Sequence, residues 1–480
     1  MASTFTEMPG AAPDVMRDYD LATLGYEETE YSVEGKALSY ELKGDRGEDG
    51  HWDVVLGEEA PFRTRFVVRR PIDPARFSGV AVVEWHNVSG GIDAAPDWNF
   101  FHRHVCAQGH AWVGVSAQKV GIDGGGFVES IHLKLLAPER YGELQHPGDA
   151  WSFDMFTQVG ELLRRPPGEN PLRGLTAQWV LAAGESQSAA CLVTYINAVD
   201  PHARTFDGYF VHGRPGAGVA IDGVFIPSAR AGSGIEGTRE VIAAKGERIR
   251  EDACVPVFVF QSETDLVVLG GGKARQPDSE RIRCWEVAGA AHADTYTVNA
   301  GRHDDGTVDG ARLAELMRPT RSLILGETDR PINSGPQQHY VAHAVLSHLV
   351  RWVTDGQVPP TALRLELDVG GEEYGRDEQG IARGGLRTPW VDAPVAALGG
   401  LGQTGESFAF LFGTTEAFGE TTLAQLYPGG RDEYLERFAA SLDEAIGAGY
   451  LLAEDRDEIL ELAAAPCSYP LELAGGYGGA

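Results

Sequence analysis

The chain has 480 residues, of which 43% are hydrophobic, so it can bury a large core and is not intrinsically disordered. Its formal net charge is −30, from 70 acidic and 40 basic residues. Such a surface repels phosphate backbones and anionic lipids, so we expect neither a nucleic-acid partner nor binding to a membrane.

The five cysteines are scattered along the chain and include no CxxC pair. They therefore predict neither a disulfide framework nor a zinc site. The first residues lack a basic stretch followed by an apolar one, and no run approaches the roughly 18 apolar residues of a membrane helix. We expect a soluble, cytoplasmic protein.

The N-terminal part of the sequence predicts antiparallel strands. Residues 1–21 are expected to form a loose leader. Residues 22–70 alternate polar and apolar positions, contain turn clusters such as GDRGEDG, and end in the strand-like segment 63–68. This pattern is typical of antiparallel strands at one side of a sheet.

The pattern changes after residue 78. Residues 79–83, with the sequence GVAVV, form a continuous apolar run typical of a strand buried on both faces of a parallel sheet. Strands and helices then alternate. Further strands are predicted over 110–116, 178–183, 209–211, 255–260 and 281–287, and helices over 97–108, 149–165, 187–199 and 340–354.

This alternation predicts an α/β fold, in which right-handed crossovers build a mostly parallel sheet with helices on both faces. The core is expected to span residues 22–360. Residues 214–253 and 295–337 do not fit the alternation and are expected to be cap or loop insertions. Residues 361–480 are predicted to be a C-terminal extension of helices and turns, packed on the core.

The segment Gly184-Glu185-Ser186-Gln187-Ser188 follows a predicted buried strand and opens a predicted helix. A nucleophilic serine in this setting sits on a tight turn whose flanking residues must be small, at a helix N-terminus that favours negative charge. The segment departs from G-x-S-x-G because Ser188 replaces the last glycine. Taken alone, it fits an ordinary strand–helix junction with capping serines equally well.

Residues further along the chain favour the nucleophile. Hydrolases of this kind carry serine, acid and histidine in that order. Asp265 follows the predicted strand 255–260, and His292 follows the predicted strand 281–287. Of the 14 histidines, only His292 combines this order with a strand-end position, so we predict it to be the general base. Asp265 is the expected acid, and Glu263 is the alternative, with loop hydrogen bonding as its other role.

The oxyanion hole is expected to combine two backbone N–H groups. One comes from Gln187, directly after the nucleophile. The other comes from Asn87 or Val88, in the loop Glu84-Trp85-His86-Asn87-Val88-Ser89-Gly90-Gly91 that follows the first buried strand. Gly90 and Gly91 either let a carbonyl oxygen approach closely or simply form a turn.

Several of these stretches together resemble the family described as "alpha/beta hydrolase domain-containing protein". The matching stretches are residues 84–91, Asp97-Trp98, Arg140-Tyr141-Gly142, residues 184–188, residues 287–294, Asn333-Ser334-Gly335-Pro336 and residues 387–396. The resemblance implies a single elaborated α/β-hydrolase domain with an esterase-like serine triad. It does not fix a substrate.

The sequence thus predicts a carboxylic ester hydrolase that cleaves a small or medium ester through an acyl-enzyme on Ser186. This chemistry requires no cofactor and no metal. A lactonase or thioesterase with the same triad is the first alternative. The second is a non-catalytic ligand-binding protein on a hydrolase scaffold, which has no need of a general base.

Overall fold

The computed structural model describes residues 3–10, 12–13, 16–125, 131–166, 168, 170–222, 246–323, 326–406 and 408–465. Most of the insertion expected at 214–253 lies outside the described residues. The chain divides into two compact units. Unit 1 consists of Met1–Val259, Leu269–Arg283 and His348–Pro359, and unit 2 of Phe260–Val268, Cys284–Ser347 and Pro360–Ala480.

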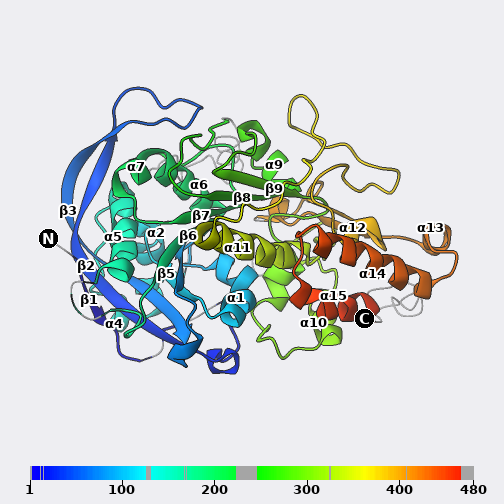
Figure 1. The fold of residues 1–480 in the computed structure, drawn as a ribbon, viewed down its shortest axis with the longest axis horizontal. Coiled ribbons are helices and arrows are strands. Elements are labelled where there is room, and N and C mark those ends of the chain that lie inside the picture. Colours follow the sequence, from blue (N-terminus) through cyan, green and yellow to red (C-terminus); the bar gives the residue numbers. More distant parts are fainter. Residues whose placement is uncertain are drawn as a thin grey trace. The chain divides into compact units, whose positions relative to one another are not determined.

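The apolar runs form one nine-stranded sheet with the order β1-β2-β3-β5-β4-β6-β7-β8-β9 (Figure 1). Pairing is antiparallel from β1 to β5 and parallel between β5, β4, β6 and β7. The strands are β1 (Thr4–Glu7), β2 (Tyr26–Leu42), β3 (Val54–Pro71), β4 (Val80–Trp85), β5 (Ala111–Val115), β6 (Trp179–Glu185), β7 (Gly208–His212), β8 (Val257–Ser262) and β9 (Ile282–Val287).

Helices connect the strands from β4 to β9, as the alternation of the sequence predicts. These are α1 (Pro96–Gln108), α2 (Lys119–Asp123), α3 (Leu133–Leu136), α4 (Pro138–Tyr141), α5 (Ser152–Arg164), α6 (Gln187–Thr194), α7 (Asp200–Ala203) and α9 (Glu263–Val267). After β9 follow α10 (Gly310–Leu316), α11 (Gln337–Asp355), α12 (Pro389–Asp392), α13 (Glu420–Leu426), α14 (Arg431–Gly447) and α15 (Arg456–Ala464). None of the helices described is long and apolar enough to cross a lipid bilayer.

In unit 1, helices cover both faces of the sheet. Because successive side chains point to opposite faces, neighbouring residues of one strand contact helices on different sides. On β7, Phe210 lies against Phe101 of α1, with ring centroids 5.8 Å apart. Its neighbour Tyr209 points the other way and meets Tyr195, which follows α6. All residues of β4, β5 and β7 are buried. The prediction of an α/β sheet with helices on both faces is confirmed.

The expectation of a loose leader over residues 1–21 is wrong for β1. Residues Thr4 to Glu7 pair antiparallel with β2, with Phe5 opposite Val33. The Phe5 ring packs edge-on against Tyr31 and Phe66. This one apolar side chain anchors an otherwise polar strand, and so short a segment carries too little periodicity to be recognised in the sequence.

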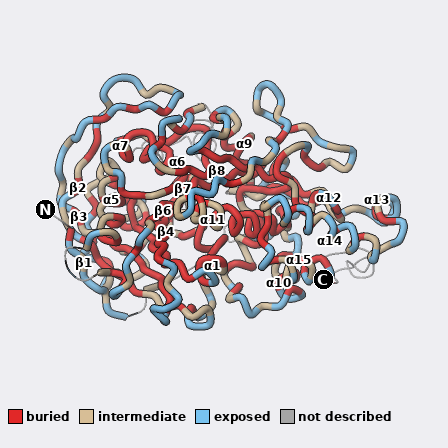
Figure 2. The backbone as a smooth tube through the Cα atoms, viewed as in Figure 1, coloured by how far each residue is buried: buried red, intermediate tan, exposed pale blue. Residues whose placement is uncertain are grey.

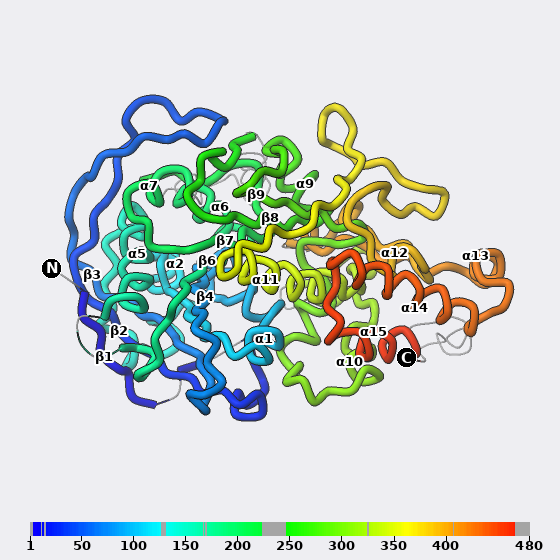
Figure 3. The backbone as a smooth tube through the Cα atoms, viewed as in Figure 1, coloured from blue at the N-terminus to red at the C-terminus, as the bar shows by residue number. Residues whose placement is uncertain are grey.

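Unit 2 does not begin at the expected boundary near residue 360. Leu266 and Ala288 pack in one apolar cluster with residues from beyond that boundary, namely Leu365, Tyr374, Ile381, Ala382 and Val391. The segments after β8 and β9 therefore share a core with the C-terminal part of the chain. In this unit β12 (Ala396–Gly399) pairs with β13 (Thr414–Ala417), β10 (Ser322–Leu323) pairs with β11 (Gly326–Glu327), and α14 contacts α15 (Figure 3).

Candidate active site

Ser186 occupies a sharp turn between β6 and α6. Its backbone angles are φ 60° and ψ −118°, a combination that is sparsely populated for residues other than glycine. Two hydrogen bonds hold this turn: Ser186 N donates to His212 O at 2.8 Å, and Ala190 N donates to Ser186 O at 3.1 Å. Strained backbone of this kind persists only where the surroundings impose it, and it gathers at functional sites.

The residues that flank Ser186 are small for a steric reason. A Cβ atom on Gly184 would lie 3.0 Å from the backbone carbonyl carbon and oxygen of Ser188, so α6 approaches β6 too closely for a side chain there. Ser188, which stands where the motif has its last glycine, is fully buried. Its hydroxyl oxygen has no hydrogen-bond partner. This replacement is therefore tolerated without a hydrogen bond to the hydroxyl oxygen.

Ser186 is the one position of this region that reaches the surface. Every residue from Val180 to Asp200 is buried except Ser186, and β6 and α6 are accordingly almost entirely red in Figure 2. The turn thus leaves one partly exposed residue within an otherwise buried stretch of chain. That is the arrangement a nucleophile requires, since its hydroxyl must meet a substrate from outside.

The loop after β4 lies against both neighbours of Ser186. The side-chain amide of Asn87 donates to Glu185 O at 3.1 Å and to Glu185 Oε2 at 3.2 Å. On the other side, Val88 N donates to Gln187 Oε1 at 3.3 Å. The structure therefore brings Asn87, Val88 and Gln187 together around the serine, as the expected oxyanion hole requires.

The three backbone N–H groups of the expected oxyanion hole differ in what they bind. Asn87 N donates to Ala94 O at 2.8 Å, within its own loop. Val88 N donates to the Gln187 side chain, whose amide nitrogen in turn donates to Gln118 Oε1 at 2.8 Å. Gln187 N precedes the first hydrogen bond of α6, so it needs a partner from outside the helix. Val88 and Gln187 are the better suited pair.

In unit 2 the structure pairs His292 with Asp265. Asp265 Oδ1 lies 2.5 Å from His292 Nδ1. The other carboxylate oxygen accepts from Ser262 N at 2.6 Å, in a capping box at the start of α9. The His292 loop is held from the first turn of α11, because Gln338 Nε2 donates to His292 O at 3.0 Å. A histidine whose Nδ1 is bound to a carboxylate has its Nε2 oriented for proton transfer.

Glu263, the alternative acid, has a different set of partners. Its two carboxylate oxygens accept from Gly289 N at 2.5 Å and from Gly400 N at 2.7 Å. Burial raises the pKa of this carboxyl group. Glu263 thus ties the small-residue loop before His292 to the segment after β12, which is the loop-bonding role considered for it from the sequence.

A second histidine–carboxylate pair was missed from the sequence. His212, at the end of β7, has its Nδ1 2.8 Å from Asp97 Oδ1 on α1. Beside it, the Glu84 carboxylate accepts from Asp97 N at 2.9 Å and from Trp98 N at 2.8 Å. Burial and the neighbouring carboxylate of Glu185 raise the pKa of Asp97 well above its usual range. Two signals in the sequence pointed to Asp97: its place in the first turn of a predicted helix, and the match of Asp97-Trp98 to the family.

The fold and these local arrangements are those of an α/β hydrolase. The chain belongs to the alpha/beta hydrolase domain family, whose model matches residues 2–461. No curated protein matches the chain. The family and the nine-stranded sheet with its covering helices make the protein a hydrolase.

Solved structures similar to this chain include other hydrolases. They include a putative dienelactone hydrolase from Klebsiella pneumoniae, which is 12% identical, with a TM-score of 0.30 over 57% of this chain and 92% of that one. An esterase from Pyrococcus furiosus is 9% identical, with a TM-score of 0.30 over 57% and 85% of the two chains. The family model alone assigns the chain to this family.

Proposed function

We propose that the protein is a serine esterase that cleaves a small or medium carboxylic ester through an acyl-enzyme on Ser186. The observation that carries this proposal is Ser186 itself, whose backbone is strained and which is the only partly exposed residue from Val180 to Asp200. The His292–Asp265 pair supports it, because both residues follow Ser186 in the order of a hydrolase triad.

In the proposed mechanism, His292 Nε2 takes the proton of the Ser186 hydroxyl as the serine oxygen attacks the ester carbonyl carbon. The imidazolium then gives this proton to the departing alcohol, which leaves an acyl group on Ser186. A water molecule, deprotonated by His292, attacks the acyl carbonyl carbon. The bond from this carbon to Ser186 Oγ then breaks, His292 returns the proton to the serine oxygen, and the acid leaves. Asp265 keeps the imidazole in the required tautomer and stabilises its positive charge.

The negative oxygen of each tetrahedral intermediate would be held by Val88 N–H and Gln187 N–H. Asn87 is less suited, because its backbone N–H closes the loop on Ala94. Val88 N–H donates to the Gln187 side chain in the substrate-free protein. We therefore propose that the Gln187 side chain turns away when a substrate carbonyl enters. Val88 N–H then donates to the substrate oxygen instead of to Gln187 Oε1.

The test compares two neighbouring serines. Ser186→Ala is expected to abolish hydrolysis of p-nitrophenyl acetate and butyrate, since removal of a triad nucleophile costs on the order of 10⁶-fold in kcat. Ser188→Ala is the matched control: its hydroxyl is buried without a partner, so the rate is expected to stay within about twofold. A wild-type protein that hydrolyses no activated ester, or an Ser186→Ala variant that retains the rate, would falsify the proposal.

The same acyl transfer would serve a lactone or a thioester. Assaying γ-lactones and short acyl thioesters beside the nitrophenyl esters ranks these substrate classes by kcat/KM. A non-catalytic binding protein on this scaffold would turn over none of them, and Ser186→Ala would leave its ligand affinity unchanged.

A further inference from the structure

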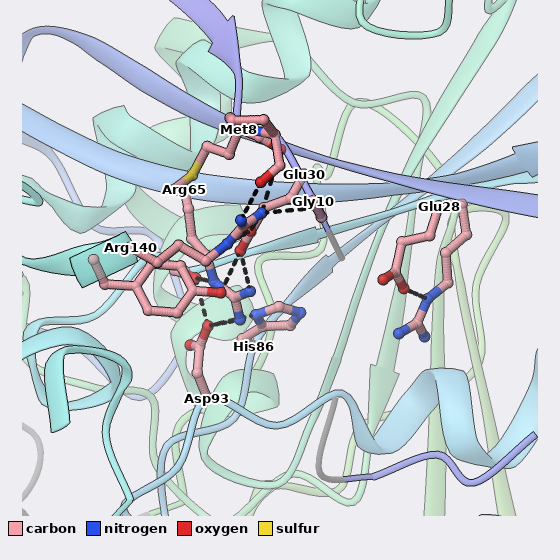
Figure 4. Close-up of polar contacts among 12 residues, drawn as sticks. Met8, Gly10, Glu28, Glu30, Arg65, His86, Asp93 and Arg140 are labelled. Atoms are coloured by element: carbon pink, nitrogen blue, oxygen red, sulfur yellow. Dashed lines mark hydrogen bonds and ion pairs between the residues drawn. The ribbon is translucent and has the colours of Figure 1, made fainter. Parts of the chain in front are cut away.

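The loop that carries Val88 is closed and anchored within unit 1. Two backbone hydrogen bonds between Asn87 and Ala94, of 2.8 and 2.9 Å, join its ends. Asp93 lies just inside this closure with a buried carboxylate (Figure 4). Its Oδ2 accepts from Arg65 Nη2 at 2.8 Å and lies 2.9 Å from His86 Nδ1. The hydroxyl of Ser116 also donates to it.

Arg65 ties this carboxylate to the N-terminal strands. It lies on β3 and is buried, and its Nη1 donates to Glu30 Oε1 on β2 at 2.6 Å while its Nε donates to Ser116 Oγ at 2.9 Å. Arg140 Nε donates to the other oxygen of Glu30 at 2.6 Å. The charges of Arg65 and Arg140 therefore balance those of Glu30 and Asp93. The contacts of Asp93 come from β3, from the residue after β4 and from the residue after β5.

Gly114 leaves space in the sheet for the His86 side chain. A Cβ atom on Gly114 of β5 would lie 2.1 Å from His86 Nε2, so any side chain there would displace the imidazole. The glycine leaves room for His86 beside Trp112, with ring centroids 5.8 Å apart. The position of His86 is thus determined by the sheet beneath it as well as by Asp93.

An ionic cluster of this kind is not explained by stability alone. Taking paired charges out of water costs several kcal/mol per ion, and well-packed apolar residues of the same volume often stabilise a protein equally well or better. What charged hydrogen bonds add is direction, because a carboxylate held by three donors has one position. Here that position fixes the end of the loop whose Val88 N–H faces the Ser186 turn.

We propose that Asp93 is a positioning residue for acyl transfer: held by Arg65, His86 and Ser116, it sets the loop that directs the Val88 N–H at the oxyanion. This inference rests on the proposed function of Ser186. Asp93 itself touches no reacting atom. Its effect should therefore appear in the transition state, where the oxyanion forms, rather than in the binding of the ester.

The test uses Asp93→Asn, which keeps the shape of the side chain but removes the negative charge that Arg65, His86 and Ser116 share on Oδ2. We expect kcat for p-nitrophenyl butyrate to fall about 10- to 100-fold while KM changes less than about twofold, because small misplacements of a catalytic group cost up to about 100-fold. Phenylboronic acid, whose tetrahedral adduct with a serine places an oxygen in such a hole, should bind more weakly by a similar factor.

The matched control is Glu28→Gln. Glu28 forms an ion pair with Arg69 across the same two strands, with Oε2 to Nε at 2.8 Å, and is drawn in Figure 4 away from the loop. This variant is expected to retain kcat and boronic acid affinity. Ser116→Ala provides a second, milder change to the Asp93 contacts, with an expected loss of kcat of about 3- to 10-fold, and replaces Asp93→Asn should that variant not fold.

The outcomes separate the two proposals. An active wild type, an inactive Ser186→Ala variant, and full kcat in both Asp93→Asn and Ser116→Ala would overturn the inference and leave the esterase intact. An equal loss of kcat in Glu28→Gln would also overturn it, because the effect would then be a general one of buried charge. A wild type without esterase activity removes the proposed function, and the inference with it.

Discussion

The pairs His212–Asp97 and His292–Asp265 both lie at the ends of strands of the sheet, and their surroundings differ more than their geometry. His212 and Asp97 lie in unit 1, with Nδ1 and Oδ1 2.8 Å apart, and His292 and Asp265 lie in unit 2, at 2.5 Å. The His212 ring packs between Phe100 and Phe210 and is 1% exposed. His292 is also buried, at 5%, but it lies in a small-residue loop beyond the end of β9.

This difference shows that a histidine–carboxylate pair is not by itself a catalytic unit. Burial and the carboxylate of Glu185 raise the pKa of Asp97 well above its usual range, which disfavours the anionic form that would best stabilise an imidazolium. The pKa of the neighbouring Glu84 is likewise raised, by burial and by the charge of Asp97. We interpret the His212 pair as a structural tie between β7 and α1, and the His292 pair as the catalytic one.

The largest effect that distinguishes the two pairs is expected when the two imidazoles are removed in turn. His292→Ala is expected to lower kcat for activated esters on the order of 10⁶-fold, because the serine loses its general base. Steady-state kinetics on the purified variant measure this loss, and its circular dichroism spectrum establishes that the fold is retained. Near-normal activity in His292→Ala would exclude this residue as the base.

The next largest effect distinguishes the two acids. Asp265→Asn is expected to lower kcat on the order of 10⁴-fold, because the amide favours the wrong tautomer of His292. Glu263→Gln is the matched control: it is expected to keep kcat within about tenfold but to lose about 1–3 kcal/mol of unfolding free energy, since one of two buried backbone N–H groups loses its acceptor. Exchanged results would make Glu263 the acid.

A third prediction concerns Asp294, two residues after His292 in the same loop. Burial raises the pKa of this carboxyl to about 7, although bonds from Thr297 oppose the shift. Because the folded state binds the proton more tightly than the unfolded state, this group favours folding at low pH and loses that contribution as the pH rises through 7. Asp294→Asn cannot ionise.

The variant should therefore gain unfolding free energy relative to wild type between pH 4 and pH 8, by up to about 4 kcal/mol. Urea unfolding at several pH values measures this difference. A constant difference across the range would show that Asp294 titrates alike in the folded and unfolded chains. A corresponding change in unit 1, Asp97→Asn, sharpens the comparison, since the same sign is expected from the raised pKa of Asp97.

The smallest expected effect on activity is that of His212→Gln. The side-chain amide can still donate toward Asp97, so we expect a loss of about 1–3 kcal/mol in unfolding free energy and kcat within about fivefold. Thermal unfolding and ester kinetics measure the two quantities. A loss of kcat comparable with that of His292→Ala would make His212 the base and reverse the assignment of the two pairs.

How much of this was predictable depends on the range of the interactions. The strands from β4 to β9 and the turn at Ser186 follow from local patterns of apolar and small residues, and the sequence order of Asp265 and His292 suggested their pairing. Contacts between residues far apart in the chain left no such pattern. Asp97 and His212 are 115 residues apart, and Arg65 and Asp93 are 28 apart.

One feature of the sequence indicated a buried ionic cluster around Asp93: a charged residue inside a predicted strand. Arg65 lies in the strand-like segment 63–68, and a buried charge requires partners. Nothing in the sequence names those partners, because hydrogen bonds between strand ends depend on the strand order of the finished sheet. Phe5 of β1 is a similar case, since its packing partners Tyr31 and Phe66 lie on two other strands.

The central claim, that Ser186 is the nucleophile, is tested most directly by locating a covalent adduct. Wild-type protein treated with a fluorophosphonate and digested should yield one modified peptide, with the added mass on Ser186, and the Ser186→Ala variant should yield none. An adduct on Ser188 or another residue, or a wild-type protein that remains unmodified, would contradict the account.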